Sequence, residues 1–145
     1  MRAPFSVHGV IPAAASIWAK NSVPLVRART LSLTIRLYFE ASMDADATVY
    51  VYYSPDGDNW DTIQLTSWAI AYTASTTKQV TKIIDVPEHG YVWFKITNGS
   101  QSYTITKVKM WYTIQSWPEV GEEIVEQILR KALKRQRQEE TGQRV

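Results

Sequence analysis

Residues 49–62 (VYVYYSPDGDNWDT) hold the feature that most constrains the fold, a strand that ends in a tight turn. Its first residues are β-branched or aromatic, and such side chains fit the pleated surface of a sheet. Pro55, Asp56 and Gly57 follow directly, an order typical of reverse turns because proline presets its own φ and glycine tolerates positive φ. We interpret the segment as scaffold, a corner of a β-sheet domain.

Similar strands recur along residues 30–116. Apolar and polar residues alternate through 31–40, which predicts a half-buried strand, and further strands are predicted near 48–54, 68–72, 80–86 and 91–97. Asn98-Gly99 predicts a hairpin turn with positive φ at both positions. One face of a last, long strand is expected to carry Thr104, Thr106, Val108, Met110, Tyr112 and Ile114. This spacing predicts an all-β fold, an antiparallel β-sandwich or jelly roll.

Residues 1–29 are predicted to form an extended N-terminal arm, because Pro4, Pro12 and Pro24 exclude a long helix. A free arm with this apolar content would expose too much apolar surface. It therefore covers its own domain or lies on a neighbouring subunit, and we favour the neighbour. The residues expected to make that subunit contact are Phe5, Val7, Ile11 and Trp18.

Residues 117–145 are predicted to form an amphipathic helix to about residue 140 and then a frayed tail. Acidic residues gather near its amino end and basic residues near its carboxyl end, which complements the helix dipole. Apolar residues recur three and four positions apart in one stripe. The stripe packs on the sandwich, docks into another subunit or lies on a membrane surface. The residues we assign to a subunit contact are Ile124, Ile128, Leu129 and Leu133.

Composition limits the functional classes. The chain has 145 residues, a net charge of +2 and no cysteine, so disulfides, thiolate zinc sites and cysteine nucleophiles are excluded. The charge is too balanced for a dedicated nucleic-acid binder, and no apolar run is long enough to span a membrane. His8, Gly9 and Pro12 interrupt the apolar N-terminal run, so we expect no secretory signal peptide.

The sequence contains no Walker loop, GxSxG, HExxH or dinucleotide-binding glycine pattern, and its histidines, His8 and His89, have no catalytic neighbours in sequence. We therefore predict no enzyme activity, no cofactor and no metal site. The acidic residues of loop 56–61 have oxygen donors that suit calcium, but they also suit an ordinary solvated turn. Asn98-Gly99-Ser100 matches a glycosylation sequon, which the predicted turn explains without a sugar.

Aromatic side chains are numerous, with six Trp and eight Tyr. If exposed, they would form a stacking platform for sugar rings. If buried, they would only fill the core, which strand aromatics commonly do. The candidates for a platform are Tyr50, Tyr52, Trp60, Trp68, Trp93 and Trp111.

Two parts of the sequence also resemble known protein families. The stretch 54–60 (SPDGDNW) resembles the strand-turn signature of discoidin-type sandwich domains, although the cysteine pair of that family is absent. More broadly, residues 23–115 contain the succession of segments 27–37, 49–62, 83–96 and 108–113, and this succession resembles small β-sandwich structural proteins of tailed phages and related prokaryotic viruses.

The second resemblance implies a capsid decoration or other accessory subunit of the virion, assembled in the host cytoplasm. The expected partners are other copies of the chain, as a homo-oligomer, and a major capsid or other virion protein, but neither nucleic acid nor membrane. A carbohydrate-binding or adhesin-like module is the alternative.

Overall fold

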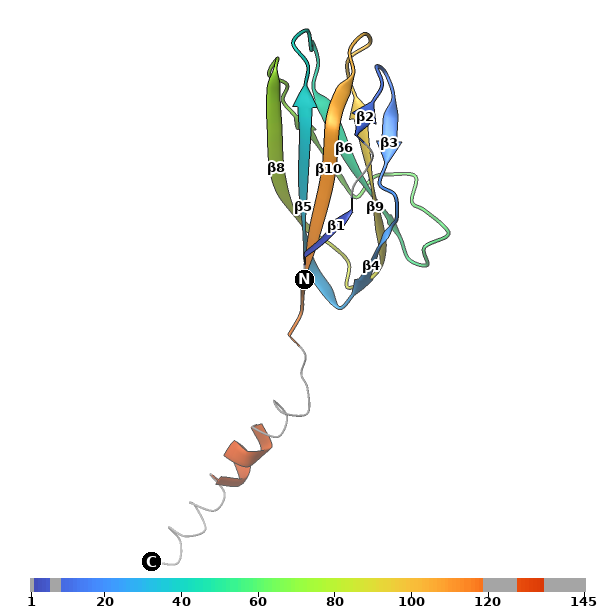
Figure 1. Ribbon diagram of the computed structural model, residues 1–145. Helices are drawn as coiled ribbons and strands as arrows, with labels where there is room; N and C mark the ends of the chain where they lie inside the picture. The colour runs from blue at the N-terminus through green and yellow to red at the C-terminus, as the bar shows by residue number, and fades with distance from the viewer. Residues whose placement is uncertain (1, 6–8, 119–127, 135–145) are drawn as a thin grey trace, which may run out of the picture.

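The computed structural model describes residues 2–5, 9–118 and 128–134, which form an elongated β-sandwich and a short helical segment (Figure 1). The helical segment covers residues 128–134. The strands are β1 (Arg2–Phe5), β2 (Val10–Ile11), β3 (Ser16–Trp18), β4 (Val23–Val26), β5 (Ala28–Phe39), β6 (Ala47–Ser54), β7 (Thr66–Ile70), β8 (Thr76–Asp85), β9 (His89–Asn98) and β10 (Ile105–Ser116).

The strands form two antiparallel sheets. One has the order β1-β10-β5-β8, with β2 also paired to β10, and the other has the order β3-β9-β6-β7, with β4 also paired to β9. If β1–β2 and β3–β4 each count as one interrupted strand, the chain pairs its first strand with its last, its second with the next to last, and so inward to β6–β7. Such a rolled-up hairpin is a jelly roll. The predicted all-β, antiparallel fold class is therefore confirmed.

The core lies between the two sheets and follows from the alternation of apolar residues. On β5, every second side chain from Leu31 to Phe39 is fully buried. Val51, Phe94 and Ile96 are equally buried on the facing sheet. Because successive residues of a strand point to opposite faces, the intervening side chains remain on the outer surface. The predicted strand register is thus confirmed for β5.

The register predicted for β10 is wrong at its beginning. A bulge interrupts the β10–β5 ladder between Thr106 and Lys109, and Lys107 has a φ of 54°. The additional residue brings both Ile105 and Val108 into the core, so Thr104 and Thr106 do not share the inner face with Val108. Beyond the bulge Met110 is buried, as expected.

The Asn98-Gly99 pair does not form the predicted hairpin turn. Neither residue has positive φ, and the segment connects β9 in one sheet to β10 in the other. The buried Asn98 amide donates to the carbonyls of Ile11, Pro12 and Tyr103, and its oxygen accepts from the Ser100 amide. Because this side chain is 1% exposed and fully bonded, it also makes a poor glycosylation acceptor.

The N-terminal segment is extended, as predicted, but its described residues pair within their own sandwich. β1 and β2 pair with β10, while β3 and β4 pair with β9. Ile11 and Val23 are buried in the core. We considered that this segment covers its own domain or lies on a neighbouring subunit. Residues 2–5 and 9–29 follow the first alternative, not the one we favoured.

The helical segment 128–134 lies in the predicted C-terminal helix, and all seven of its residues are exposed. Its apolar side chains Ile128, Leu129 and Leu133 are 62%, 57% and 56% exposed, so they do not pack on the sandwich. In the described part of the chain, no helix has the length and apolar character needed to cross a bilayer.

Candidate functional site: an aromatic cavity on one sheet

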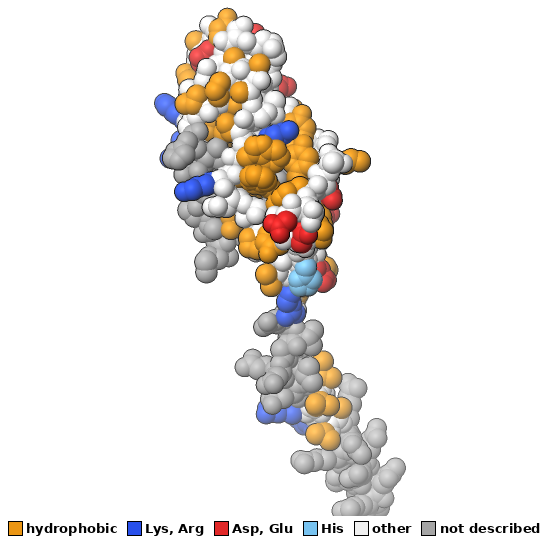
Figure 2. Space-filling view, turned by 90° about the vertical axis from the view of Figure 1, so that its right-hand side faces the viewer, with side chains coloured by type: hydrophobic (Ala, Val, Ile, Leu, Met, Phe, Trp, Pro, Cys, Tyr) orange, Lys and Arg blue, Asp and Glu red, His pale blue; other side chains and the backbone are white. Residues whose placement is uncertain are grey.

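The outer face of the β3-β9-β6-β7 sheet carries a group of aromatic side chains. Trp18 pairs opposite Lys95, which in turn pairs opposite Tyr50, so three strands form one row across the sheet. In the next row Trp93 of β9 lies opposite Tyr52 of β6. Hydrophobic side chains gather in the middle of this face, with a basic side chain beside them (Figure 2).

The aromatic rings contact one another. The ring centroid of Trp93 is 4.6 Å from that of Trp18 and 5.6 Å from that of Trp60, and Trp18 is 5.4 Å from Tyr52. The ring planes are inclined by 36–46°, so the rings form a curved surface and not a flat one. The Trp93 indole N–H donates to the Ala19 carbonyl at 2.7 Å, which fixes the orientation of the ring.

Trp60 reaches this face from the loop between β6 and β7, and a hydrogen-bonded turn precedes it. The buried Ser54 hydroxyl accepts from the Gly57 amide at 2.8 Å and donates to the Asp56 carboxylate at 3.0 Å. That carboxylate accepts from the backbone amides of Asp58 and Asn59 and from the Asn59 side chain. Gly57 supplies the positive φ of 83° that the turn requires.

These bonds explain the acidity of Asp56. The backbone amide of Asn59, followed by that of Asp58 and the Asn59 side chain, holds the pKa of Asp56 well below its usual range. A carboxylate that accepts several N–H bonds is stabilised in its charged form. The oxygens of Asp56 are therefore already used inside the turn, which favours the solvated-turn interpretation of loop 56–61 over calcium binding.

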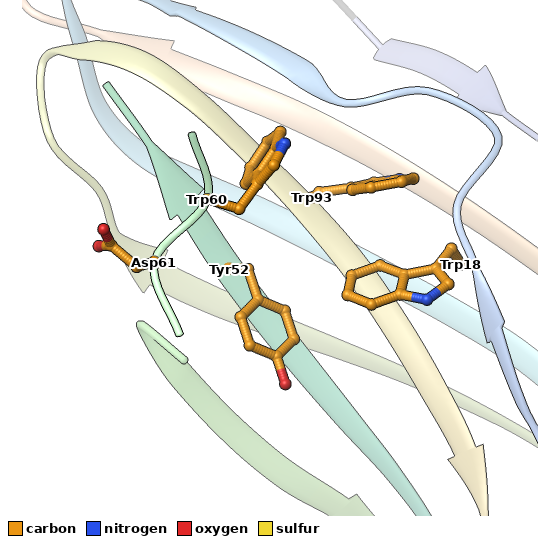
Figure 3. Close-up of a pocket in the computed structure, with 5 residues that line it drawn as sticks. All are labelled: Trp18, Tyr52, Trp60, Asp61 and Trp93. Carbon is orange, nitrogen blue, oxygen red and sulfur yellow. The ribbon is translucent and has the colours of Figure 1, made fainter. Parts of the chain in front are cut away.

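Together these side chains line a cavity of about 330 Å³ (Figure 3). Its lining consists of Trp18, Tyr52, Trp60, Asp61 and Trp93. In the close-up the Asp61 carboxylate and the Tyr52 hydroxyl point away from the indole rings, so the inner surface is aromatic and the polar groups lie at its rim. Small-ligand sites commonly combine such apolar walls with a few polar groups.

Lys95 sets the charge at the edge of the cavity. Its ammonium group lies 5.4 Å from the ring centroids of both Trp18 and Tyr52 and 4.8 Å from that of Tyr50. These distances are within the range of cation–π attraction. A positive charge thus sits beside two of the rings that line the cavity.

Comparisons with known proteins give similarity of fold. No family model matches the chain, and no curated protein matches it. The fold is shared.

A chain of the infectious bursal disease virus Gx strain is similar with a TM-score of 0.53 at 11% identity, over 83% of this chain and 32% of that one. The present chain thus spans about a third of the virus chain. A Yersinia pseudotuberculosis-derived mitogen gives a TM-score of 0.46 at 16% identity, over 84% and 92% of the two chains. A chain of the cowpea mosaic virus empty particle gives 0.37 at 13% identity, over 83% and 88%.

Four of the six residues predicted for an aromatic platform come together on this face: Tyr50, Tyr52, Trp60 and Trp93. Trp68 pairs opposite the buried Val49 and packs against the core, and Trp111 lies on β10 of the other sheet. Trp18 and Lys95 were not predicted as members. The short alternation around Trp18 carries too little signal to place β3 beside β9.

The residues predicted for a subunit contact do not form one cluster. Ile11 is fully buried in the sandwich and Trp18 lies in the aromatic cavity, whereas Ile128, Leu129 and Leu133 are exposed on the helical segment. The backbone of Phe5 pairs with Met110. The side chain of Phe5 and the whole of Val7 and Ile124 lie outside the described residues.

Metal-binding groups do not gather in the part of the chain that the structure describes. Within residues 2–5, 9–118 and 128–134, no three His, Cys, Asp or Glu side chains approach closely enough to hold a metal ion. His89 is exposed at the beginning of β9, and His8 lies outside the described residues.

Proposed function

We propose that the protein is a non-enzymatic structural subunit of a virus particle, a decoration or accessory component that assembles through its C-terminal helix. Other copies of the chain and a major capsid or other virion protein are the proposed partners, and the virion is the proposed location.

The exposed apolar stripe of the helical segment carries this proposal. Ile128, Leu129 and Leu133 are each more than half exposed, although the sandwich buries a hydrophobic core of its own. An amphipathic helix gains stability mainly by burying its apolar face, so a stripe left in water indicates a missing partner surface. Docking into another subunit buries it without enlarging the domain.

The fold supports the same conclusion by analogy. Double-sheet jelly rolls recur in viral capsid and lectin domains, and the infectious bursal disease virus chain shares this architecture. Because one fold hosts many functions, the analogy supports the proposal only together with the exposed helix.

The proposed contact surface is smaller than the sequence suggested. Ile11 fills the core of its own domain and takes no part, and Trp18 lies in the aromatic cavity. The helical stripe remains, and Phe5, Val7 and Ile124 are kept as further proposed contact residues.

Site-specific photo-crosslinking tests the proposal. A photoreactive amino acid at position 129 should yield a covalent dimer or a larger species of the full chain. The same residue at position 134 should not, because Lys134 lies on the opposite side of the helix. Equal yields at both positions, or no intermolecular product at either, would contradict a role of the stripe in assembly.

A further inference from the structure

We propose that the cavity lined by Trp18, Tyr52, Trp60 and Trp93 is a saccharide-binding site, which takes a neutral or acidic pyranose ring of a glycan. This function is separate from assembly through the helix, because none of the four residues lies on the helical segment 128–134.

The shape and chemistry of the lining fit a sugar ring. A pyranose has apolar patches of C–H groups on its faces and hydroxyl groups around its edge. Indole and phenol rings offer large, rigid apolar surfaces for the former. Aromatic rings inclined to one another by 36–46° can together enclose a puckered sugar ring. A flat aromatic ligand would contact only one of these rings closely. The volume of about 330 Å³ lies at the small end of ligand sites.

The positive charge of Lys95 disfavours a cationic ligand in the cavity. Aromatic cages of this kind can bind quaternary ammonium groups. Here the Lys95 ammonium already lies 5.4 Å from the centroids of Trp18 and Tyr52, so a second cation in the cavity would meet a like charge at close range. The same ammonium can donate to a sugar hydroxyl or pair with a uronic-acid carboxylate.

Polar groups for the sugar edge lie around the aromatic surface. The Asp61 carboxylate and the Tyr52 hydroxyl are at the rim, and the Lys95 ammonium lies beside Trp18 and Tyr52. An extended proline-rich peptide needs an open groove with few such groups. A compact cavity with an aromatic floor and a hydroxyl- and charge-bearing rim favours a saccharide.

The site is also held in place before any ligand arrives. Trp93 and Tyr52 stand on two paired strands, the Trp93 indole is bonded to Ala19, and the Ser54–Asp56 turn precedes Trp60. Side chains that are already ordered lose little entropy on binding. Such preorganisation is expected of a binding surface.

The test is a glycan array of neutral, N-acetylated and uronic-acid oligosaccharides, probed with the full-length chain. The strongest soluble hit is then titrated by tryptophan fluorescence. Trp18→Ala and Trp60→Ala should each weaken binding roughly tenfold or more. The matched control is Trp117→Ala, because Trp117 is 45% exposed against 41% for Trp18 yet lies outside the cavity. This control should bind like the natural chain.

Three results would overturn the proposal: no saccharide bound at millimolar concentration, saccharide binding unchanged in Trp60→Ala with the fold intact by circular dichroism, or selective binding of a proline-rich decapeptide.

Choline provides a further check. The natural chain should not bind it, and Lys95→Met should gain binding. Sedimentation of Trp60→Ala distinguishes this proposal from assembly, because a change in oligomeric mass is expected only if the helix stripe is altered.

Discussion

Trp93 donates its indole N–H to the carbonyl of Ala19 at 2.7 Å, which ties the middle of β9 to the residue that follows β3. The bond holds the Trp93 ring 4.6 Å from that of Trp18, so the N-terminal segment and the second half of the chain build one surface together. The aromatic cavity depends on this link between distant parts of the sequence.

Trp93→Phe should therefore destabilise the domain while it keeps an aromatic ring on the surface. The change leaves the Ala19 carbonyl without its donor and shortens the side chain, at an expected cost of about 1–2 kcal/mol. Urea unfolding followed by circular dichroism measures this difference. Trp117→Phe serves as the control and should change the unfolding free energy by less than about 0.5 kcal/mol.

Ser54→Ala should loosen the turn that precedes Trp60. The Ser54 side chain is fully buried, and its removal leaves the Gly57 amide without an acceptor. The expected loss of stability is about 1–2 kcal/mol. Amide hydrogen exchange should increase at residues 57–61 and remain unchanged at β5. Unchanged exchange in the loop would show that the hydroxyl does not hold the turn.

The pH dependence of stability should include a contribution from Asp56. Its pKa in the folded protein is lower than its usual value of 3.8, so its charged form stabilises the fold above that pH. The contribution is lost as the pH falls below 3.8 towards the folded pKa. The difference in urea midpoint between the natural chain and Asp56→Asn should shrink between pH 6 and pH 2.5. A constant difference over that range would contradict the assigned cause.

Local patterns in the sequence were sufficient to predict those features that depend only on neighbouring residues of one strand. The strict alternation from Leu31 to Phe39 predicted one buried face of β5 because side chains of a strand alternate whatever its neighbours are. The same reasoning failed at β10, since a single bulge at Lys107 reverses the faces and leaves no mark in the alternation. Asn98-Gly99 has the composition of a hairpin but connects two sheets.

The aromatic site could be predicted only in part because its geometry is non-local. Trp68 and Trp93 both stand on predicted strands, yet pairing opposite Val49 directs Trp68 inward and pairing opposite Tyr52 directs Trp93 outward. Trp18 joins the site only because the jelly-roll order places β3 beside β9. Neither relationship is visible before the order of the strands is known.

Asn98→Ala should be among the most damaging single substitutions. The side chain is 1% exposed and bonds three carbonyls and one amide, which connect the end of β9 to the end of β2, to the residue after it and to the segment before β10. The loss of several buried partners should cost about 2–3 kcal/mol. Thermal unfolding checks this value. The exposed neighbour Gln101 provides a control, and Gln101→Ala should have little effect.

Sedimentation equilibrium of the full-length chain tests the central claim, that the exposed helical stripe drives assembly, most directly. The natural chain should sediment as a concentration-dependent oligomer. Leu129→Glu combined with Leu133→Glu should reduce it to a monomer with an unchanged circular dichroism spectrum of the sandwich, and Lys134→Glu should leave the oligomer intact. A natural chain that remains monomeric and folded at about 100 μM, with its C-terminal segment resistant to proteolysis, would contradict the proposed assembly role.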